Sequence, residues 1–141
     1  MTSMALIAGL EAADAGKAGV ISGLLIAAVA DNLSDSLSVH MYQESERLEQ
    51  KDAFIGTVAN FATRFVVCVS FVLIVGLLPK QLATVWGVAW GLLLLTTLTY
   101  ILARYRKVSA VSEIIKHVGV AVAIIMVSQR VGHWIARHVM S

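Results

Sequence analysis

The sequence contains little cysteine and little charge, and each shortage excludes a class of protein. Cys68 is the only cysteine among the 141 residues, so an intrachain disulfide is impossible, and its apolar surroundings indicate an inert packing residue. Basic residues are scattered apart from Arg104, Arg106 and Lys107, and the formal net charge of +2 gives no nucleic-acid signature. We therefore expect no nucleic-acid partner.

Segments typical of secretion and of catalysis are also missing. The N-terminus has no basic region followed by a cleavage site, so Met1–Ala15 does not form a convincing signal peptide. The sequence shows no nucleophile paired with a base, no phosphate-binding loop and no zinc-ligand spacing. We therefore expect that the protein is not an enzyme.

Apolar residues, in contrast, are abundant. Hydrophobic residues make up 58% of the chain, charged residues only 14%, and the mean hydropathy is +0.81. A soluble domain of this size cannot bury so much apolar surface, so the composition predicts an all-α membrane protein in contact with lipid.

The apolar runs predict one domain, residues 16–141, with four transmembrane helices. The predicted helices are 17–42, 53–78, 82–102 and 112–134. Pro79 ends the second helix, and the short loop that follows makes the second and third helices an antiparallel pair. Residues 1–15 are too short to span a bilayer, which takes about 20 residues, so we expect a short N-terminal arm or an interfacial helix there.

The basic residues predict an orientation in the membrane. Six Lys or Arg residues lie on the side of loops 43–53 and 103–111, and four lie on the side of the termini. The positive-inside tendency places both loops in the cytoplasm and both termini on the non-cytoplasmic side. In a bacterium the membrane would be the cytoplasmic (inner) membrane.

Two G-x-x-x-G pairs provide small residues for close helix packing. They are Gly19 with Gly23 in the first helix and Gly87 with Gly91 in the third. Small residues at this spacing let helix backbones approach each other closely, although the pattern also occurs often by chance.

Polar residues interrupt the first helix where hydrocarbon is expected. With Asp31 placed at zero on a helical wheel, the angles are about 40° for Asp35, −20° for Ser38, 20° for Tyr42 and 0° for Glu49. One polar stripe therefore runs from the middle of the membrane to an acidic segment at the cytoplasmic surface. Intramembrane carboxylates favour a functional interpretation because they are costly in lipid.

Oxygen ligands along such a path suit a divalent cation such as Fe²⁺ or Mn²⁺. Entry of the metal would release protons from the Asp31–Asp35 pair, which suits metal–proton exchange. The predicted metal-site residues are Asp31, Asp35, Asn32, Ser38, Tyr42, Glu44, Glu46 and Glu49.

A second interpretation needs no metal. Arg64 is near the middle of the second helix, so it can form an ion pair with Asp31, and Asn60, one turn earlier, can join either arrangement. His40 and Glu44 can pair with each other or form a second ligand set on the cytoplasmic side. In this alternative the chain is a non-transporting membrane subunit whose polar stripe of Asp31, Asp35 and Arg64 serves helix–helix assembly.

Three segments carry a family resemblance. Ala30–Val39 reads ADNLSDSLSV, Tyr42–Glu49 is acidic, and Phe71–Pro79 reads FVLIVGLLP. They resemble, in order, the second helix, the start of the cytoplasmic extension and the close of the third helix of the vacuolar iron transporter family. The resemblance covers about residues 16–136. It implies Fe²⁺ or Mn²⁺ as the bound or transported ion and a homodimer; we expect no organic cofactor.

The chain also departs from that family. The family has an additional first helix with its own intramembrane carboxylate, Val39 stands where the family has methionine, and the cytoplasmic metal-binding helices are shortened here. We therefore expect a shortened form in which two or more subunits, or a partner, complete the pathway. The expected function is transport of divalent iron or manganese out of the cytoplasm, with possible proton exchange.

Overall fold

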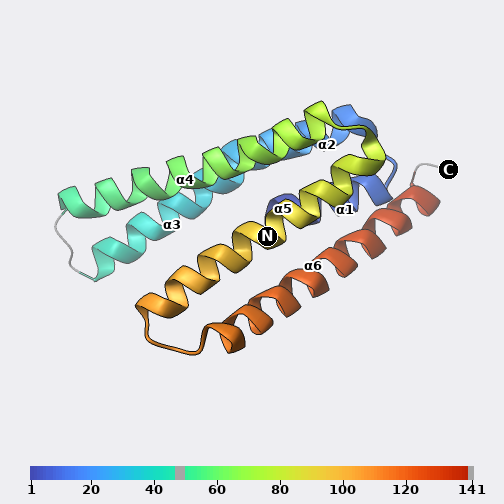
Figure 1. Ribbon diagram of the computed structural model, residues 1–141. Helices are drawn as coiled ribbons and strands as arrows, with labels where there is room; N and C mark the ends of the chain where they lie inside the picture. Colours follow the sequence, from blue (N-terminus) through green and yellow to red (C-terminus); the bar gives the residue numbers. More distant parts are fainter. Residues whose placement is uncertain (47–49, 140–141) are drawn as a thin grey trace.

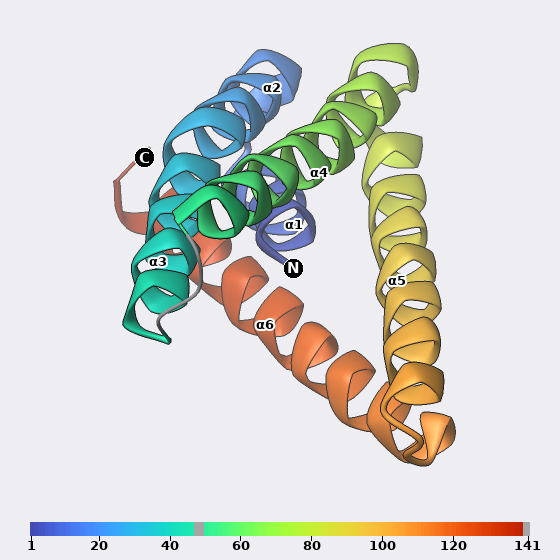
Figure 2. The same ribbon diagram turned by 90° about the vertical axis from the view of Figure 1, so that its left-hand side faces the viewer.

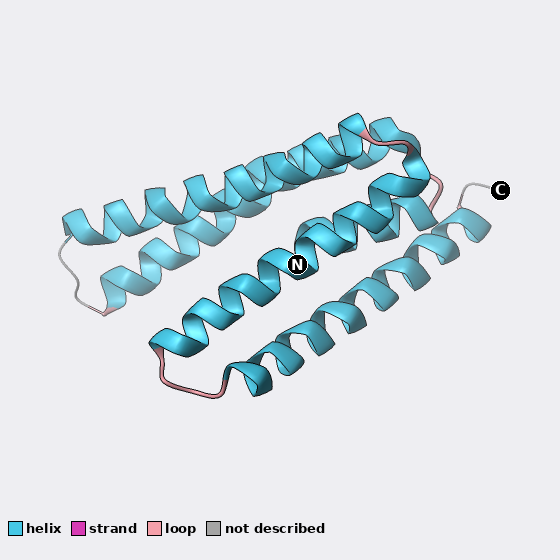
Figure 3. Cartoon of the chain, in the orientation of Figure 1, coloured by secondary structure: helices cyan, strands magenta, loops and turns pink. Residues whose placement is uncertain are grey.

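The computed structural model describes residues 1–46 and 50–139, and its regular elements in these ranges are all helical (Figures 1 and 3). In chain order they are α1 (Thr2–Ala12), α2 (Gly16–Ile26), the π-helix η1 (Ala27–Asp31), α3 (Asn32–Ser45), α4 (Gln50–Leu77), α5 (Lys80–Tyr105) and α6 (Ala110–His138).

Four helical segments are long and apolar enough to cross a membrane. Consecutive α2, η1 and α3 form one span, and α4, α5 and α6 provide the others; the spans are Gly16–Ser45, Lys51–Leu77, Leu82–Tyr105 and Ala110–His138. The prediction of an all-helical chain with four such helices is confirmed. The sides on which the termini lie and the oligomeric state stay predictions.

Residues with restricted or unusual backbone angles separate the helices. Pro79, at φ −59° and ψ 150°, lies between α4 and α5, because proline lacks the N–H that would continue α4. The turn between α1 and α2 contains Asp14 with positive φ, and Gly16, the first residue of α2, also has positive φ. The turn after α5 contains Lys107 with φ 56°. These turns reverse the chain over a few residues.

The short helix α1 packs inside the bundle against α2, α5 and α6, and its N-terminal end lies among the longer helices (Figure 2). Met4, Ile7 and Ala8 are at most 2% exposed. For residues 1–15 we expected a short N-terminal arm or an interfacial helix; the structure forms the helix α1 there, and its position relative to a membrane stays a prediction. Apolar residues occur on all sides of α1, so it can contact several helices at once, while Thr2 remains exposed.

Because α1 contacts partners on several sides, it links two antiparallel pairs. The α2–η1–α3 span pairs with α4, and α5 pairs with α6. The core shared by these helices includes Ile7, Leu24, Phe71, Val75 and Ala83. In Figure 2, α4 and α5 diverge from the turn that contains Pro79.

Candidate functional site

A line of polar side chains joins η1 and α3 to α4. We call it the polar seam, and it consists of Asp31, Asn32, Asp35, Ser36, His40, Thr57, Asn60 and Arg64. Asn32 and Ser36, one helical turn apart, are buried at its centre with exposures of 5% and 2%. The seam is the main polar contact between the first two spans.

The guanidinium of Arg64 forms the largest cluster in the seam. Its Nε donates a 2.9 Å hydrogen bond to Asn32 Oδ1. Its Nη1 forms an ion pair with the carboxylate of Asp35, and its Nη2 lies 3.7 Å from Asp31 Oδ2. Each of the three guanidinium nitrogens therefore faces a different side chain, an arrangement that the planar, forked geometry of arginine allows and lysine would not.

The seam continues from this cluster toward the loop between α3 and α4. Asn60 Nδ2 donates to Ser36 Oγ at 3.2 Å. His40 Nδ1 lies 3.1 Å from Thr57 Oγ1, and His40 Nε2 lies 3.4 Å from Glu44 Oε1. Because the Thr57 hydroxyl donates to the Ala53 carbonyl at 2.8 Å, the Thr57 oxygen acts as acceptor and His40 Nδ1 as donor.

A π-helical turn lies directly before the buried centre of the seam. Residues Ala27–Asp31 form η1, and the Asn32 side chain donates a 2.9 Å hydrogen bond back to the Ala28 carbonyl. Single π-turns inside longer helices are frequent at functional sites. The sequence predicted a uniform α-helix here, and no Gly or Pro in this segment signals the change.

The cluster carries a surplus negative charge at the middle of two candidate membrane spans. Arg64 is the central residue of the 27-residue span Lys51–Leu77, and Asp31 lies next to the centre of Gly16–Ser45. Two carboxylates and one guanidinium leave a formal charge of −1. Their side chains are 37–46% exposed in the single chain, so a further cation or a second chain can reach them.

The other predicted ligands do not join this cluster. Ser38 is exposed and donates to the Ser34 carbonyl of its own helix at 3.0 Å, and Tyr42 is 65% exposed. Glu44 and Glu46 are exposed near the end of α3, and Glu49 lies outside the described residues. Of the eight predicted ligands, the structure therefore brings together Asp31, Asn32 and Asp35.

Within residues 1–46 and 50–139, no group of three or more His, Cys, Asp or Glu side chains is placed to hold a metal ion. Asp31 and Asp35 supply two carboxylates, and Asn32 adds an amide oxygen rather than a third such group. One chain thus offers an oxygen-rich but incomplete ligand set, with Arg64 bound to it.

Sequence reasoning missed several members of the seam. Ser36 and Thr57 were not predicted, because the wheel was centred on the charged residues rather than on Asn32. A wheel centred on Asn32 places Ser36 about 40° away and His40 about 80° away, which is the face that meets α4. Cys68, treated as inert, donates to the Leu24 carbonyl at 3.2 Å in the same helix pair.

The glycines of the two predicted G-x-x-x-G pairs lie against side chains of α1 or of the turn that follows α1. A Cβ added at Gly87 would meet Ile7 Cδ1 at 3.0 Å, and one at Gly91 would meet the Met4 side chain. A Cβ at Gly23 would meet Leu10 Cδ1 at 2.7 Å, and one at Gly19 would meet Ala15 Cβ at 3.1 Å.

The tightest approach of this kind was not predicted. A Cβ added at Gly132 on α6 would collide with the backbone carbonyl oxygen of Gly9 on α1. Neither glycine belongs to a G-x-x-x-G pair, so sequence spacing gave no signal for this contact.

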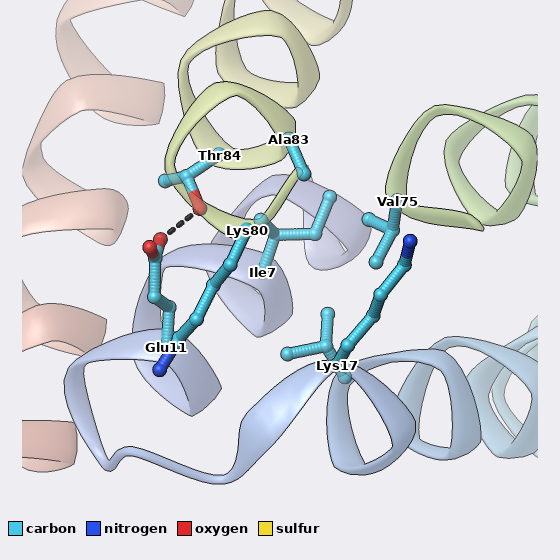
Figure 4. A pocket seen from close by; sticks show the side chains of 8 residues that line it. Ile7, Glu11, Lys17, Val75, Lys80, Ala83 and Thr84 are labelled. Atoms are coloured by element: carbon cyan, nitrogen blue, oxygen red, sulfur yellow. Dashed lines mark hydrogen bonds between the residues drawn. The ribbon is translucent and has the colours of Figure 1, made fainter. Parts of the chain in front are cut away.

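A second polar group lies where α1, α2, α4 and α5 meet (Figure 4). Thr84 donates a hydrogen bond to the Glu11 carboxylate, and Lys80 pairs with Asp14 at 2.6 Å. Lys17 Nζ donates to the Gly76 carbonyl at 2.6 Å, close to the C-terminal end of α4.

Charge and burial shift two carboxyl groups in opposite directions here. Burial raises the pKa of Glu11, and the charge of Lys80 opposes this more weakly. The hydrogen bond from Lys80 lowers the pKa of Asp14. The contacts of Lys80 with Asp14 and of Thr84 with Glu11 link α1 and the turn after it to the start of α5.

No family model, curated protein or solved structure matches this chain.

Proposed function

We propose that the chain is a small integral membrane protein that binds and transports a divalent cation, iron or manganese, through the Asp31–Arg64–Asp35 cluster. One observation carries the proposal: two carboxylates face a single guanidinium at the middle of their spans. A unit charge at the centre of a bilayer costs about 2.5–3.5 kcal/mol on insertion scales, so the surplus charge favours binding of a cation.

The oxygen atoms of the cluster suit a divalent iron or manganese ion. The carboxylates of Asp31 and Asp35 and the amide oxygen of Asn32 are oxygen ligands, which Fe²⁺ and Mn²⁺ accept. Because Arg64 contacts all three side chains, an arriving divalent cation must displace the guanidinium. Arg64 thus acts as a tethered counterion that stabilises the carboxylates whenever the cargo is absent.

Acidic residues at the cytoplasmic end provide a route to the cluster. Glu44 and Glu46 are exposed at the end of α3, and His40 next to Glu44 connects them with the seam. Glu49 would add to this capture surface. Cations would thus be collected on the cytoplasmic side and leave toward the opposite side, in exchange for protons returned to the Asp pair.

Three oxygens are too few for a six-coordinate cation, so the proposal includes a second copy of the chain. Two copies that bring their Asp31 and Asp35 side chains together would supply four carboxylates, each able to bind through one or two oxygens. The partial exposure of both carboxylates leaves room for this contact. A homodimer is therefore the proposed working unit.

Flux measurements in proteoliposomes test the proposal. Wild type should take up Fe²⁺ and Mn²⁺, and Asp31→Asn and Asp35→Asn should each reduce this flux at least about tenfold, the loss seen when even a supporting group of a metal site is removed. Asp52→Asn, which removes an exposed carboxylate at the start of α4, is the matched control and should retain wild-type flux. Equal flux in wild type and Asp35→Asn would overturn the assignment of Asp35.

A second candidate is a non-transporting subunit in which the seam serves helix–helix assembly. The observation that favours it is that Arg64 already has an acceptor for each guanidinium nitrogen. Elemental analysis of the purified protein, together with its oligomeric state, separates the two candidates. Absence of bound or transported metal, together with dissociation of the oligomer in Asp35→Asn, would favour assembly.

A further inference from the structure

The C-terminal end of α6 presents a basic and aromatic face that the proposed transport does not use. Its residues line one surface hollow of about 370 Å³, and they are Arg130, His133, Trp134, Arg137 and His138. All five are exposed. Their spacing of three or four residues places them within an arc of about 140° on one side of the helix.

The opposite side of α6 holds the helix on α1. Gly132 lies against Gly9, and Ser128 Oγ donates a 2.6 Å hydrogen bond to the Ala5 carbonyl. The basic face therefore points away from this contact, and α6 lies at an edge of the bundle in Figure 1. The rings of Trp134 and His138 stack at a centroid distance of 5.3 Å, which gives this face a flat aromatic wall.

With α6 centred in the bilayer, Arg137 and His138 lie at the depth of lipid headgroups, and Arg130 reaches that depth by extending its side chain along the helix. The 29 residues of α6 extend about 43 Å, whereas the hydrocarbon core is about 30 Å thick, so the ends of the helix reach the headgroup layers. Tryptophan is enriched at this interface. From Ile114 to Val139 the sequence contains no Asp or Glu, so no acidic side chain of α6 lies beside Arg130.

We propose that this face binds the phosphate group of an anionic phospholipid such as phosphatidylglycerol. Arginine guanidinium groups recognise phosphate oxygens by paired hydrogen bonds, and Arg130 and Arg137 are two turns apart on the same side of the helix. Val127, 63% exposed, continues the same side of α6 toward the middle of the membrane. A phospholipid can contact both the basic residues, through its phosphate, and the apolar surface of α6, through its acyl chains. A soluble phosphate can contact only the basic residues.

Native mass spectrometry of the full chain released from nanodiscs tests this site. Nanodiscs that contain equal amounts of phosphatidylglycerol and phosphatidylcholine should yield wild-type protein that retains phosphatidylglycerol preferentially. Arg130→Gln with Arg137→Gln should lower this preference about 5-fold for each arginine removed, from the attraction of one basic side chain to an anionic membrane surface. Arg104→Gln with Arg106→Gln, which removes the same charge at the end of α5, should leave the preference unchanged.

Two results would overturn the proposal. One is equal retention of the two lipids by wild type. The other is an equal loss of preference in the two double variants, which would indicate a general effect of net charge. If Arg130→Gln with Arg137→Gln does not fold, as judged by circular dichroism and thermal unfolding, Arg130→Gln alone decides, and full retention of the preference by that variant would overturn the site.

Discussion

Asn32 and Arg64, which are 32 residues apart in the chain, are joined by a 2.9 Å hydrogen bond from the guanidinium Nε to the amide oxygen. This hydrogen bond to a neutral amide fixes the plane of the guanidinium, so that its two other nitrogens face Asp35 and Asp31. The orientation of Arg64 is therefore set by a buried amide, and the two carboxylates are held on one side of it.

Replacing Arg64 with Gln should destabilise the protein by about 1–3 kcal/mol, because two carboxylates at the middle of their spans lose their cation. The loss should be smaller than the about 3–5 kcal/mol for a fully buried pair, since these side chains are partly exposed. Thermal unfolding in detergent measures the change. Adding Asp35→Asn should restore part of it, and Arg104→Gln serves as the exposed control. Equal stability of Arg64→Gln and Arg104→Gln would contradict the prediction.

Ser36 and Asn60 should be energetically coupled across the α3–α4 contact. Their hydrogen bond of 3.2 Å predicts a coupling energy of about 0.6 kcal/mol, the average for polar pairs between membrane helices. A double-mutant cycle with Ser36→Ala and Asn60→Ala measures it. Ser38 and Thr63 make a control pair, because each donates to a carbonyl of its own helix. Additive effects for Ser36 and Asn60 would show that the seam does not act as a unit.

Two glycines of α6 should respond oppositely to alanine. A Cβ at Gly132 would collide with the Gly9 carbonyl oxygen and approach Ala12 Cβ at 2.9 Å, so Gly132→Ala should cost about 1–3 kcal/mol. A Cβ at Gly119 would meet nothing within 4 Å, so Gly119→Ala should stabilise the helix by about 0.5–1 kcal/mol. Thermal unfolding of both variants provides the test. If Gly132→Ala is as stable as Gly119→Ala, α1 does not pack against α6 as described.

Glu11 should make stability depend on pH. Burial raises its pKa, so its protonated form is favoured by folding; this contribution is complete below the ordinary pKa of glutamate and is lost as the pH rises through the raised value. Glu11→Gln should therefore gain stability relative to wild type as the pH rises across that interval, measured by thermal unfolding at successive pH values.

Asp14→Asn is the control with the opposite sign. The hydrogen bond from Lys80 lowers the pKa of Asp14, so the stability gained from its charged form is present above the ordinary pKa of aspartate and is lost as the pH falls through the lowered value. Asp14→Asn should therefore lose stability relative to wild type as the pH rises. The same trend in both variants would contradict these assignments.

The number of spanning helices and the location of Pro79 between two of them could be predicted from the sequence, because hydropathy and the missing N–H of proline act locally. The contact between Asp31 and Arg64 was one of two arrangements that the sequence left open, since both residues lie at similar depth in successive helices. The π-turn at Ala27–Asp31 could not be predicted, because the segment contains no Gly or Pro that would signal a change of helix type.

The sequence by itself determined that the chain consists of long apolar helices with charged residues at the centre of two of them. Long apolar segments favour helices because a helix satisfies its own backbone hydrogen bonds without water. Only the tertiary structure decided which polar groups meet. It placed Arg64 against Asn32, Asp31 and Asp35, and it placed α1 in the core against α6. The reason is that such contacts depend on the rotation and separation of packed helices, which are fixed by side chains distant in the sequence.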